Sequence, residues 1–443
     1  MTLLTRSLIL LICAFSQISQ LAAQNKPILL SVDNTLKQTM RYGMDYERLW
    51  YWSSSISAER KAQVAKWSVV DCDIDYLRVA INSKYELIEG KYDLRAYTHR
   101  IIPMMQAMKK ANPDIKFFAS PRPLNEVVKK AAWQPYPQWI TGSSGSGKNF
   151  KFDWKKCAQY LVRYIKLMDK YDFKISYLDV TNEWNHITPT HVRDIADHLK
   201  KELPSNQVPL IIAPSTWNFA QGESWLKKVN TKRRRDAIDI SASHNTDKTG
   251  TARDFVRRSH KILGPEKEIW NTELHGWKST SKTNEVTSFS FMIEAIRAGF
   301  SGINGWLAIG TKNQGHSYIL NEKGKPKRNV KYFIFQKLTN TSHRGRVLDI
   351  TQPKELKSTT ALVKGKLLTV WAINKSSKSL SVEIDFSKHQ VDSKAPITRT
   401  HWTTKLPVEG EATRIKNEGK RSILTSIPAG STTCFEIPLK QSR

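Results

Sequence analysis

Residues 175–203 read ISYLDVTNEWNHITPTHVRDIADHLKKEL and contain one complete strand–helix unit. Residues 175–180 form a short apolar run, which predicts a buried strand. Residues 191–203 form an amphipathic stretch, which predicts a helix. Between them, Thr181-Asn182-Glu183-Trp184 occupies the point at which the strand ends. The unit therefore predicts a parallel sheet with polar side chains at the carboxyl end of a strand.

The same alternation of apolar runs and amphipathic stretches continues over residues 36–342. The other strand candidates are residues 40–44, 76–81, 115–119, 209–213, 238–242, 269–272 and 302–307. The other helix candidates are residues 55–69, 94–110, 154–170, 223–230, 252–263, 285–298 and 329–338. Eight strands with intervening helices over about 300 residues fit a (β/α)8 TIM barrel. An open, doubly wound α/β sheet is the alternative.

The pattern changes from about residue 343 to the end of the chain at residue 443. Short apolar runs separated by turn residues follow one another at residues 360–363, 367–372, 380–385, 398–402, 422–426 and 432–437. This texture is typical of an all-β sandwich. Residues 24–35 contain an early strand candidate at 28–32, which we expect to join the C-terminal sandwich.

The charge of the chain is strongly unbalanced. Lys and Arg total 70 against 40 Asp and Glu, which gives a formal charge of +30. An excess of this size favours a polyanionic partner. No recognisable nucleic-acid reader module is present. The charge alone leaves nucleic acid, an anionic membrane surface and an acidic polymer as candidates. Nucleic acid is not expected, and an exported protein of this charge would more often meet an anionic polysaccharide.

The first 23 residues have the layout of a secretory signal peptide. Arg6 precedes the apolar run of residues 8–15, and the small residues Ala22-Ala23 follow. The run is too short to span a bilayer, so we expect no transmembrane segment. We predict a secreted protein, extracellular or periplasmic; an N-terminal helix kept in the mature fold is the alternative. Cys72, Cys157 and Cys434 would then remain and could form at most one disulfide.

Two glutamates follow expected barrel strands. In such barrels the reactive side chains lie at the carboxyl ends of the strands. Glu183 follows the fourth expected strand and Glu273 the seventh, so both reach the same mouth. Other polar or aromatic residues at strand ends are Arg78, Asn82, Asn182, His244 and Trp306.

These motifs resemble those of clan A, the retaining (β/α)8-barrel glycoside hydrolases. The resemblance rests on Arg78, Asn182-Glu183, Thr272-Glu273 and Trp306 in strand order. The segment Ala119-Ser120-Pro121-Arg122-Pro123, with a sandwich behind the barrel, is most similar to glycoside hydrolase family 30. The chain departs from that family at Arg122-Pro123-Leu124, where a tryptophan and further prolines are common.

The resemblance implies a role for each residue. Glu183 would be the general acid/base and Glu273 the nucleophile. Asn182 would bind the sugar 2-hydroxyl, and His244 would orient Glu273 or touch the substrate. We expect Arg78 to keep Glu273 ionised. The structural alternatives are a packed histidine at His244 and an ordinary buried ion pair at Arg78.

Chemistry explains why two carboxyl groups are needed. Cleavage of a glycosidic bond passes through an oxocarbenium-like state, so one group protonates the leaving oxygen while another stabilises the anomeric carbon. A separation of about 5–5.5 Å between the carboxyl groups allows direct attack and retention of configuration. The expected distance between Glu183 and Glu273 is therefore short.

Tryptophan gives a second indication of a carbohydrate site. Aromatic planes stack on the C–H faces of sugar rings, and the chain has 14 tryptophans. Those at or beyond expected strand ends are Trp50, Trp52, Trp133, Trp139, Trp184, Trp217, Trp277 and Trp306. We predict that Trp133, Trp184 and Trp306 contact substrate; packing in the core or in loops is the alternative for each.

The sequence thus predicts a secreted retaining glycoside hydrolase that acts in the endo mode on a sulfated or uronate-bearing polysaccharide such as a sulfated galactan. One alternative is a glycosidase for a neutral β-glucan or xylan, whose charge serves retention at the cell surface. Another is a polysaccharide-binding barrel without turnover. No motif predicts a cofactor or a metal, and the oligomeric state is left open.

Overall fold

The computed structural model describes residues 26–47, 56–122, 135–142, 151–247, 249–275, 285–310 and 317–440. The expected signal peptide at residues 1–23 lies outside these residues, as do Trp133 and three further tryptophans of the expected mouth, Trp50, Trp52 and Trp277.

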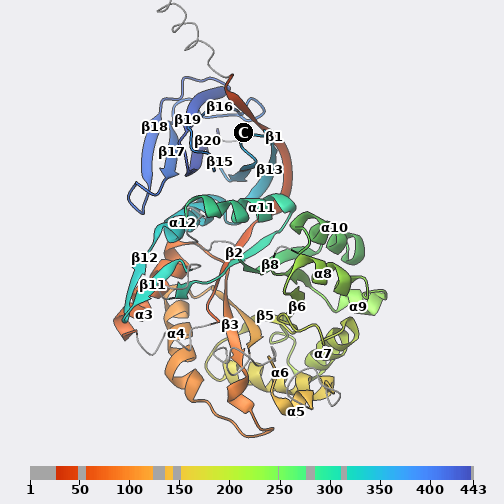
Figure 1. Ribbon diagram of the computed structural model, residues 1–443. Helices are drawn as coiled ribbons and strands as arrows, with labels where there is room; N and C mark the ends of the chain where they lie inside the picture. Colours follow the sequence, from red (N-terminus) through yellow and green to blue (C-terminus); the bar gives the residue numbers. More distant parts are fainter. Residues whose placement is uncertain are drawn as a thin grey trace, which may run out of the picture.

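Eight parallel strands form a closed barrel in the order of the chain (Figure 1). The strands are β2 (Arg41–Asp45), β3 (Tyr76–Asn82), β4 (Lys116–Arg122), β5 (Ile175–Asp179), β6 (Leu210–Thr216), β7 (Ile240–Ser243), β8 (Glu268–Leu274) and β9 (Gly302–Gly305). The ring closes where β9 pairs with β2, with Ile303 opposite Tyr42. The TIM barrel is therefore confirmed, and the open sheet is excluded. Each of the eight predicted strands overlaps an observed one.

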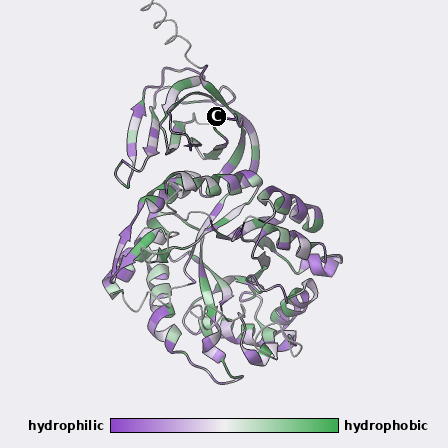
Figure 2. Ribbon diagram, in the orientation of Figure 1, coloured by the Kyte–Doolittle hydropathy of each residue, from purple (hydrophilic) through white to green (hydrophobic). Residues whose placement is uncertain are grey.

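Helices surround the barrel (Figure 1). They are α3 (Ala58–Ala65), α4 (Ile102–Ala111), α5 (Gln138–Thr141), α6 (Trp154–Asp169), α7 (Pro189–Glu202), α8 (Phe219–Leu226), α9 (Lys232–Asp236), α10 (Ala252–Leu263), α11 (Ser290–Ala298) and α12 (Val330–Ser342). Side-chain caps fix where several begin: the Asp153 carboxylate accepts the backbone N–H groups of Lys155 and Lys156 at the start of α6. Figure 2 shows hydrophobic and hydrophilic residues alternating along these helices, as amphipathic helices on a barrel require.

Aromatic side chains fill the lower part of the barrel interior. The ring of Tyr76 on β3 stacks on that of Trp270 on β8, with centroids 4.5 Å apart and planes at 8°. Two glycines make room for this pair. A Cβ at Gly43 would lie 2.2 Å from the Tyr76 ring, and one at Gly302 would lie 2.4 Å from the Trp270 ring. This aromatic cluster of Tyr76 and Trp270 lies beneath the polar residues at the carboxyl ends of the strands.

The C-terminal region is a β-sandwich made from one nine-stranded sheet. Its order is β18-β17-β20-β15-β14-β13-β1-β16-β19. The bounds are β1 (Ile28–Thr39), β13 (Arg346–Ile350), β14 (Ser358–Lys364), β15 (Leu367–Asn374), β16 (Leu380–Asp385), β17 (Ile397–Trp402), β18 (Glu411–Ile415), β19 (Ser422–Ile427) and β20 (Ser431–Pro438). The long strand β1 pairs in parallel with β16 through its first residues and antiparallel with β13 further on. The early strand thus lies within this sheet.

The sandwich packs on the barrel through α11 and α12 (Figure 1). The Trp371 ring lies 5.5 Å from that of Phe289 and stacks on Trp402, with centroids 6.2 Å apart. The Thr432 hydroxyl donates a hydrogen bond of 2.8 Å to the carbonyl of Val286. These contacts join the two units through buried aromatic side chains and a hydrogen bond.

Several elements were not predicted from the sequence. Strand β18 lies at a sheet edge and has no apolar run, which is usual for edge strands. A small sheet of β10 (Ile309–Gly310), β11 (Ile319–Glu322) and β12 (Lys325–Arg328) follows the last barrel strand. The basic run at residues 232–235 forms the short helix α9, capped by Thr231 and closed by a Lys232–Asp236 ion pair of 2.6 Å.

The three described cysteines, Cys72, Cys157 and Cys434, are all buried free thiols. Among the described residues, no helix combines the length and apolar character that crossing a bilayer requires.

Candidate active site

Glu183 and Glu273 reach the barrel mouth from β5 and β8. After β5, the Asp179 carboxylate accepts the N–H groups of Thr181 and Asn182 at 2.9 and 3.0 Å. Asn182 and Glu183 then adopt left-handed backbone conformations with φ of 34° and 65°. Such conformations are uncommon for residues other than glycine and need support from their surroundings. The Glu183 N–H donates to the carbonyl of Ser215 at 2.7 Å, which anchors this turn to β6.

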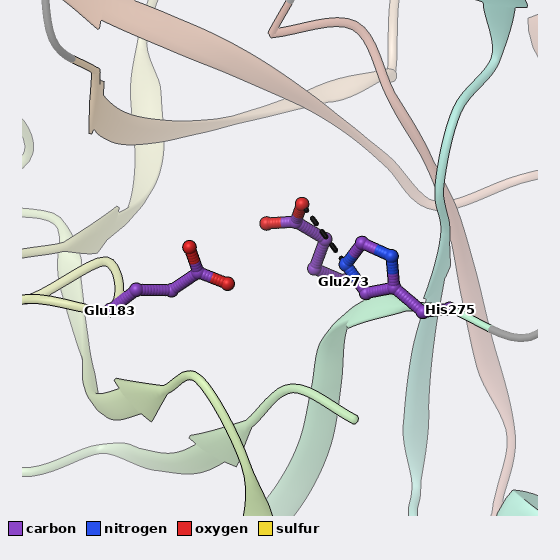
Figure 3. A group of neighbouring side chains, drawn as sticks. All are labelled: Glu183, Glu273 and His275. Carbon is purple, nitrogen blue, oxygen red and sulfur yellow. Dashed lines mark ion pairs between the residues drawn. The ribbon is translucent and has the colours of Figure 1, made fainter. Parts of the chain in front are cut away.

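The two carboxylates face one another (Figure 3). One oxygen of each glutamate and a ring nitrogen of His275 all lie within 4.8 Å of one another. Both side chains are nearly buried, at 5% and 4% exposure. The short carboxylate separation expected from the sequence is therefore present.

Arg78 on β3 lies at the centre of the polar network. Its Nη1 is 2.7 Å from Glu273 Oε2 and 2.9 Å from Asp45 Oδ2. Its Nη2 is 2.7 Å from the Asn182 Oδ1 and 2.9 Å from Glu47 Oε1. The side chain is wholly buried. One guanidinium thus holds the carboxylate of Glu273 and the side-chain amide of Asn182 in fixed positions relative to one another.

A second guanidinium lies on the other side of Glu47. Arg122, at the end of β4, forms a close ion pair with Glu47 Oε2, and its Nη2 is 3.9 Å from Glu273 Oε1. Both Arg122 and Glu47 are buried. Glu47 therefore lies between Arg78 and Arg122, and it aligns two cations beside Glu273.

The environment favours an ionised Glu273. Burial alone would raise the pKa of this carboxyl group. The positive charges of Arg78, His244 and Arg122 outweigh that effect and hold the pKa of Glu273 well below its ordinary value. A hydrogen bond from His275 acts in the same direction. Glu273 is thus a carboxylate at any pH near neutrality.

His244 lies between the two glutamates. Its Nδ1 is 2.8 Å from Glu183 Oε1 and 3.5 Å from Glu273 Oε2. Its Nε2 is 3.1 Å from the Thr272 hydroxyl, which fixes the ring. The Thr246 hydroxyl donates to the same oxygen of Glu183 at 3.2 Å. His244 is fully buried, and its ring is held by Thr272. Its direct contact with Glu183 therefore fixes the position of that carboxyl group.

His275 and Trp306 line the side of the site next to β8. His275 Nε2 is 3.2 Å from Glu273 Oε1, opposite the oxygen held by Arg78. Its ring packs on Trp306, with centroids 4.6 Å apart. Trp306 itself is half-buried. It remains accessible at the mouth, as a platform for a sugar ring would have to be.

The structure brings together most of the predicted site residues: Arg78, Asn182, Glu183, His244, Glu273 and, through His275, Trp306. Trp184 lies apart from them, with its ring packed against Tyr136 and Phe152 at 5.7 and 5.5 Å and only 5% exposed. A substrate contact by Trp184 stays a prediction. Trp133 lies outside the described residues.

Sequence reasoning missed Asp45, Glu47, Arg122 and His275 as parts of the site. Glu47 comes two residues after the end of β2, a signal that strand-end analysis could have used. Arg122 lies in the segment of residues 119–123 but has no role predicted from the sequence, and His275 lies two residues after Glu273. Their importance depends on contacts between strands that no local pattern contains.

Among the residues that the structure describes, two groups of side chains offer several metal-ligand atoms. Glu183, Glu273 and His275 form one, and Asp45, Glu47 and Glu273 the other. In the second group, Arg78 and Arg122 already contact the carboxylates and supply the balancing positive charge. The first group coincides with the facing glutamates, whose chemistry needs no cation.

The fold and the paired glutamates define the class: the chain is a clan A glycoside hydrolase with a fold similar to that of family GH30. A family model described as glycosyl hydrolase family 59 matches residues 89–322. The chain belongs to that family. A search of curated proteins finds no match.

Solved structures agree in fold. A GH30 endoxylanase from Clostridium papyrosolvens is 15% identical with a TM-score of 0.68, over 93% of this chain and 100% of that one. The catalytic domain of GH30 xylanase C from Talaromyces cellulolyticus is 13% identical with a TM-score of 0.68, over 92% and 99%. An endo-β1,6-glucanase is 15% identical with a TM-score of 0.65, over 92% and 94%.

Proposed function

We propose that this glycoside hydrolase is a secreted, retaining enzyme that cleaves an anionic polysaccharide internally, with a sulfated galactan as one candidate. The retaining mechanism rests on one observation: oxygens of Glu183 and Glu273 lie within 4.8 Å of each other across the barrel mouth. Retaining enzymes need about 5–5.5 Å between their carboxyl groups, whereas inverting enzymes leave room for a water molecule between theirs.

In the first step, Glu273 attacks the anomeric carbon and forms a covalent glycosyl ester. The glycosidic C–O bond breaks, and Glu183 gives its proton to the leaving oxygen. Arg78 and Arg122 keep Glu273 ionised before the attack. Asn182, whose Oδ1 accepts a hydrogen bond of 2.7 Å from Arg78, would bind the sugar 2-hydroxyl in this proposal.

In the second step, Glu183 removes a proton from water, and the resulting hydroxide attacks the anomeric carbon of the ester. The bond to Glu273 breaks, and its carboxylate is restored. His244, 2.8 Å from Glu183, and Thr246 hold Glu183 in the position that both proton transfers require. Two inversions give net retention.

The charge of the chain supports an anionic substrate. The formal charge of the chain is +30. The basic helix α9 is among the most hydrophilic segments of the ribbon in Figure 2. Some of its charge is neutralised, because Arg233 pairs with Asp197 at 2.9 Å. The remaining positive field would draw in a polyanion.

A neutral glycan is the second candidate substrate. The solved structures with this fold include enzymes named as endoxylanases and an endo-β1,6-glucanase. A polysaccharide-binding protein without turnover is a third possibility, against which the facing glutamates argue.

A matched pair of polymers distinguishes these functions. Purified protein is incubated with a sulfated galactan, its chemically desulfated form, a polyuronate, xylan and β-glucan, and reducing ends and product sizes are measured. We expect cleavage of a charged polymer into a ladder of oligosaccharides, with a rate that falls as salt rises. Equal cleavage of the desulfated form without salt dependence would select the neutral-glycan enzyme, and no product from any polymer would select the binding protein.

Secretion has a separate test. Expression of the full-length chain in a secreting host, followed by mass spectrometry of the mature N-terminus, should show cleavage near residue 23. An intact N-terminus in the cytoplasmic fraction would contradict it.

A further inference from the structure

A crevice of about 320 Å³ lies in the β-sandwich, away from the barrel mouth. Its lining residues that follow β16 are Phe386, Ser387, His389, Gln390, Val391 and Ser393. Those that precede β19, on the other side, are Asn417, Gly419, Lys420 and Arg421. Lys440 completes the rim after β20. Phe386 and Asn417, which line the crevice, are buried. We call it the sandwich crevice. Its volume lies at the lower end of the range of ligand sites.

The walls of the crevice are held by backbone hydrogen bonds. The Phe386 N–H donates to the Arg421 carbonyl at 3.0 Å, which ties the two sides together. The Lys440 N–H donates to the Gln390 carbonyl at 2.8 Å, which ties the rim to the first side. A site fixed in this way loses little conformational entropy when a ligand binds.

The charge of the crevice is positive. Lys420, Arg421 and Lys440 are exposed side chains that line it, and no acidic residue does. Lys420 is partly neutralised by Glu418, at 2.7 Å. No ion pair joins Arg421 or Lys440 to an acidic residue within the described part of the chain. Two cations on opposite sides of one crevice are therefore available to a ligand.

The crevice is separate from the active site. Strand β20 begins beside the barrel, where Thr432 bonds to Val286, and runs away from it towards Lys440. At about 3.3 Å per residue, the strand spans roughly 25 Å between these two points. Val286 precedes α11 on the side of the barrel where strands end, so the crevice lies at the opposite end of the sandwich.

We propose that the sandwich crevice is an accessory binding site for an anionic sugar unit of a polysaccharide, held by Arg421 and Lys440. The shared chemistry is a sulfate ester or a carboxylate, which guanidinium and ammonium groups bind through charge-assisted hydrogen bonds. Because the crevice is far from the glutamates, only a long chain could occupy both sites. Occupying both raises the effective concentration of polymer at the barrel. The anionic nature of the polymer rests on the proposed function. The existence of the binding site rests on the geometry and charge of the sandwich crevice alone.

The test separates binding from catalysis. In a Glu273→Gln background, which prevents turnover, the double variant Arg421→Gln/Lys440→Gln is compared with Lys354→Gln/Lys405→Gln. The second pair removes the same charge from exposed sandwich positions outside the crevice. Affinity for a sulfated galactan, its desulfated form and a polyuronate is measured by affinity electrophoresis and calorimetry.

We expect the crevice variant to lose about tenfold in affinity for an anionic polymer, the equivalent of one charge-assisted contact, and the control variant to lose none. Loss for the sulfated galactan alone assigns a sulfate ester, and loss for both anionic polymers assigns the shared anionic chemistry. Equal affinity of the two variants for every polymer would overturn the proposal.

A second measurement separates this proposal from the catalytic one. With Glu273 intact, the crevice variant should hydrolyse a short oligosaccharide substrate at the unchanged rate and degrade the polymer more slowly. If the intact enzyme cleaves no anionic glycan, the proposed substrate fails, while the binding comparison still decides the crevice. Equal polymer degradation by both variants would count against the accessory role.

Discussion

Oε2 of Glu273 lies 2.7 Å from Nη1 of Arg78, and neither side chain is more than 4% exposed. A buried carboxylate is costly unless a cation compensates it. Here the guanidinium of Arg78 compensates the charge of Glu273. Arg78 comes from β3 and Glu273 from β8, across the barrel. The charge of the nucleophile candidate therefore depends on a residue far away in sequence.

The Arg78 contact predicts a shift in pH dependence. Replacing Arg78 by Met removes the largest influence that lowers the pKa of Glu273, so this pKa rises. Because Glu273 must be ionised to attack, the acidic limb of kcat/KM moves to higher pH. The pH–rate profile of wild type and variant measures the shift.

Loss of Arg78 also removes an ion-pair partner of Asp45 and of Glu47. A second variant that disturbs fewer ion pairs is therefore measured beside it. Arg122→Met removes a cation 3.9 Å from Glu273, and a smaller shift in the same direction is expected. Arg163→Met, which breaks a pair with Glu86 outside the site, serves as control. An acidic limb that stays in place in both site variants would show that these cations do not set the ionisation of Glu273.

The two glutamates should give different products on chemical rescue. Glu273→Gly and Glu183→Ala are each expected to lower hydrolysis by several orders of magnitude. With an activated aryl glycoside and added azide, Glu273→Gly should form a glycosyl azide of inverted configuration, since azide replaces the nucleophile. Glu183→Ala should form one of retained configuration, since azide attacks the enzyme ester. Nuclear magnetic resonance of the products assigns the configuration, and exchanged outcomes would reverse the two roles.

The fold could be predicted because its strands and helices appear as local patterns of apolar and polar residues in the sequence. Apolar residues mark barrel strands such as β5 and β8 in the sequence, and the two glutamates lie close to the carboxyl ends of these strands at Asp179 and Leu274. Strand β18 could not be predicted, since its polar sequence at Glu411–Ile415 gains its place only by pairing with β17. Pairing at a sheet edge is not encoded in hydrophobic periodicity.

The site was predictable in part for the same reason. Glu183 and Glu273 could be found because Glu183 follows β5 and Glu273 is the penultimate residue of β8, and both strands are recognisable in the sequence. Glu47, Arg122 and His275 could not be assigned, because their roles come from contacts between different strands. Burial, too, is a property of the fold: Trp184 was expected at the mouth, and its ring lies among aromatic neighbours at 5% exposure.

The aromatic cluster of Tyr76 and Trp270 predicts a strict requirement for glycine at position 302. An added Cβ would lie 2.4 Å from the Trp270 ring, so Gly302→Ala should lower the free energy of unfolding by about 1–3 kcal/mol, as overpacking does. Chemical denaturation measures the change. The double variant Gly302→Ala/Trp270→Phe has a smaller ring at the clash and should recover part of the loss. Additive losses in the double variant would show that the strain lies elsewhere.

His343, between α12 and β13, forms a charge cluster near the base of the barrel. Its Nδ1 is 3.1 Å from Asp73 Oδ2, and its Nε2 is 2.7 Å from Asp75 Oδ2. Lys364 contacts Asp73 at 3.1 Å, and Arg344 contacts Asp75 at 3.3 Å. Burial would lower the pKa of His343, but the two aspartates outweigh it and raise this pKa. The hydrogen bond from His343 lowers the pKa of Asp73 to about 2.

The cluster predicts how stability depends on pH. A raised histidine pKa stabilises the fold fully below the unfolded value of about 6.5, and the contribution disappears as pH rises through the folded value. The Asp73 contribution is complete above about pH 4 and is lost as pH falls towards its folded pKa. Urea denaturation from pH 4 to pH 9 should therefore show His343→Gln least stable relative to wild type between about pH 4 and 6.5, with the gap narrowing at higher pH. The exposed His99, replaced in the same way, should show no such pH-dependent gap. A His343→Gln gap that stays constant from pH 5 to pH 9 would mean that the histidine acts by packing rather than by its charge.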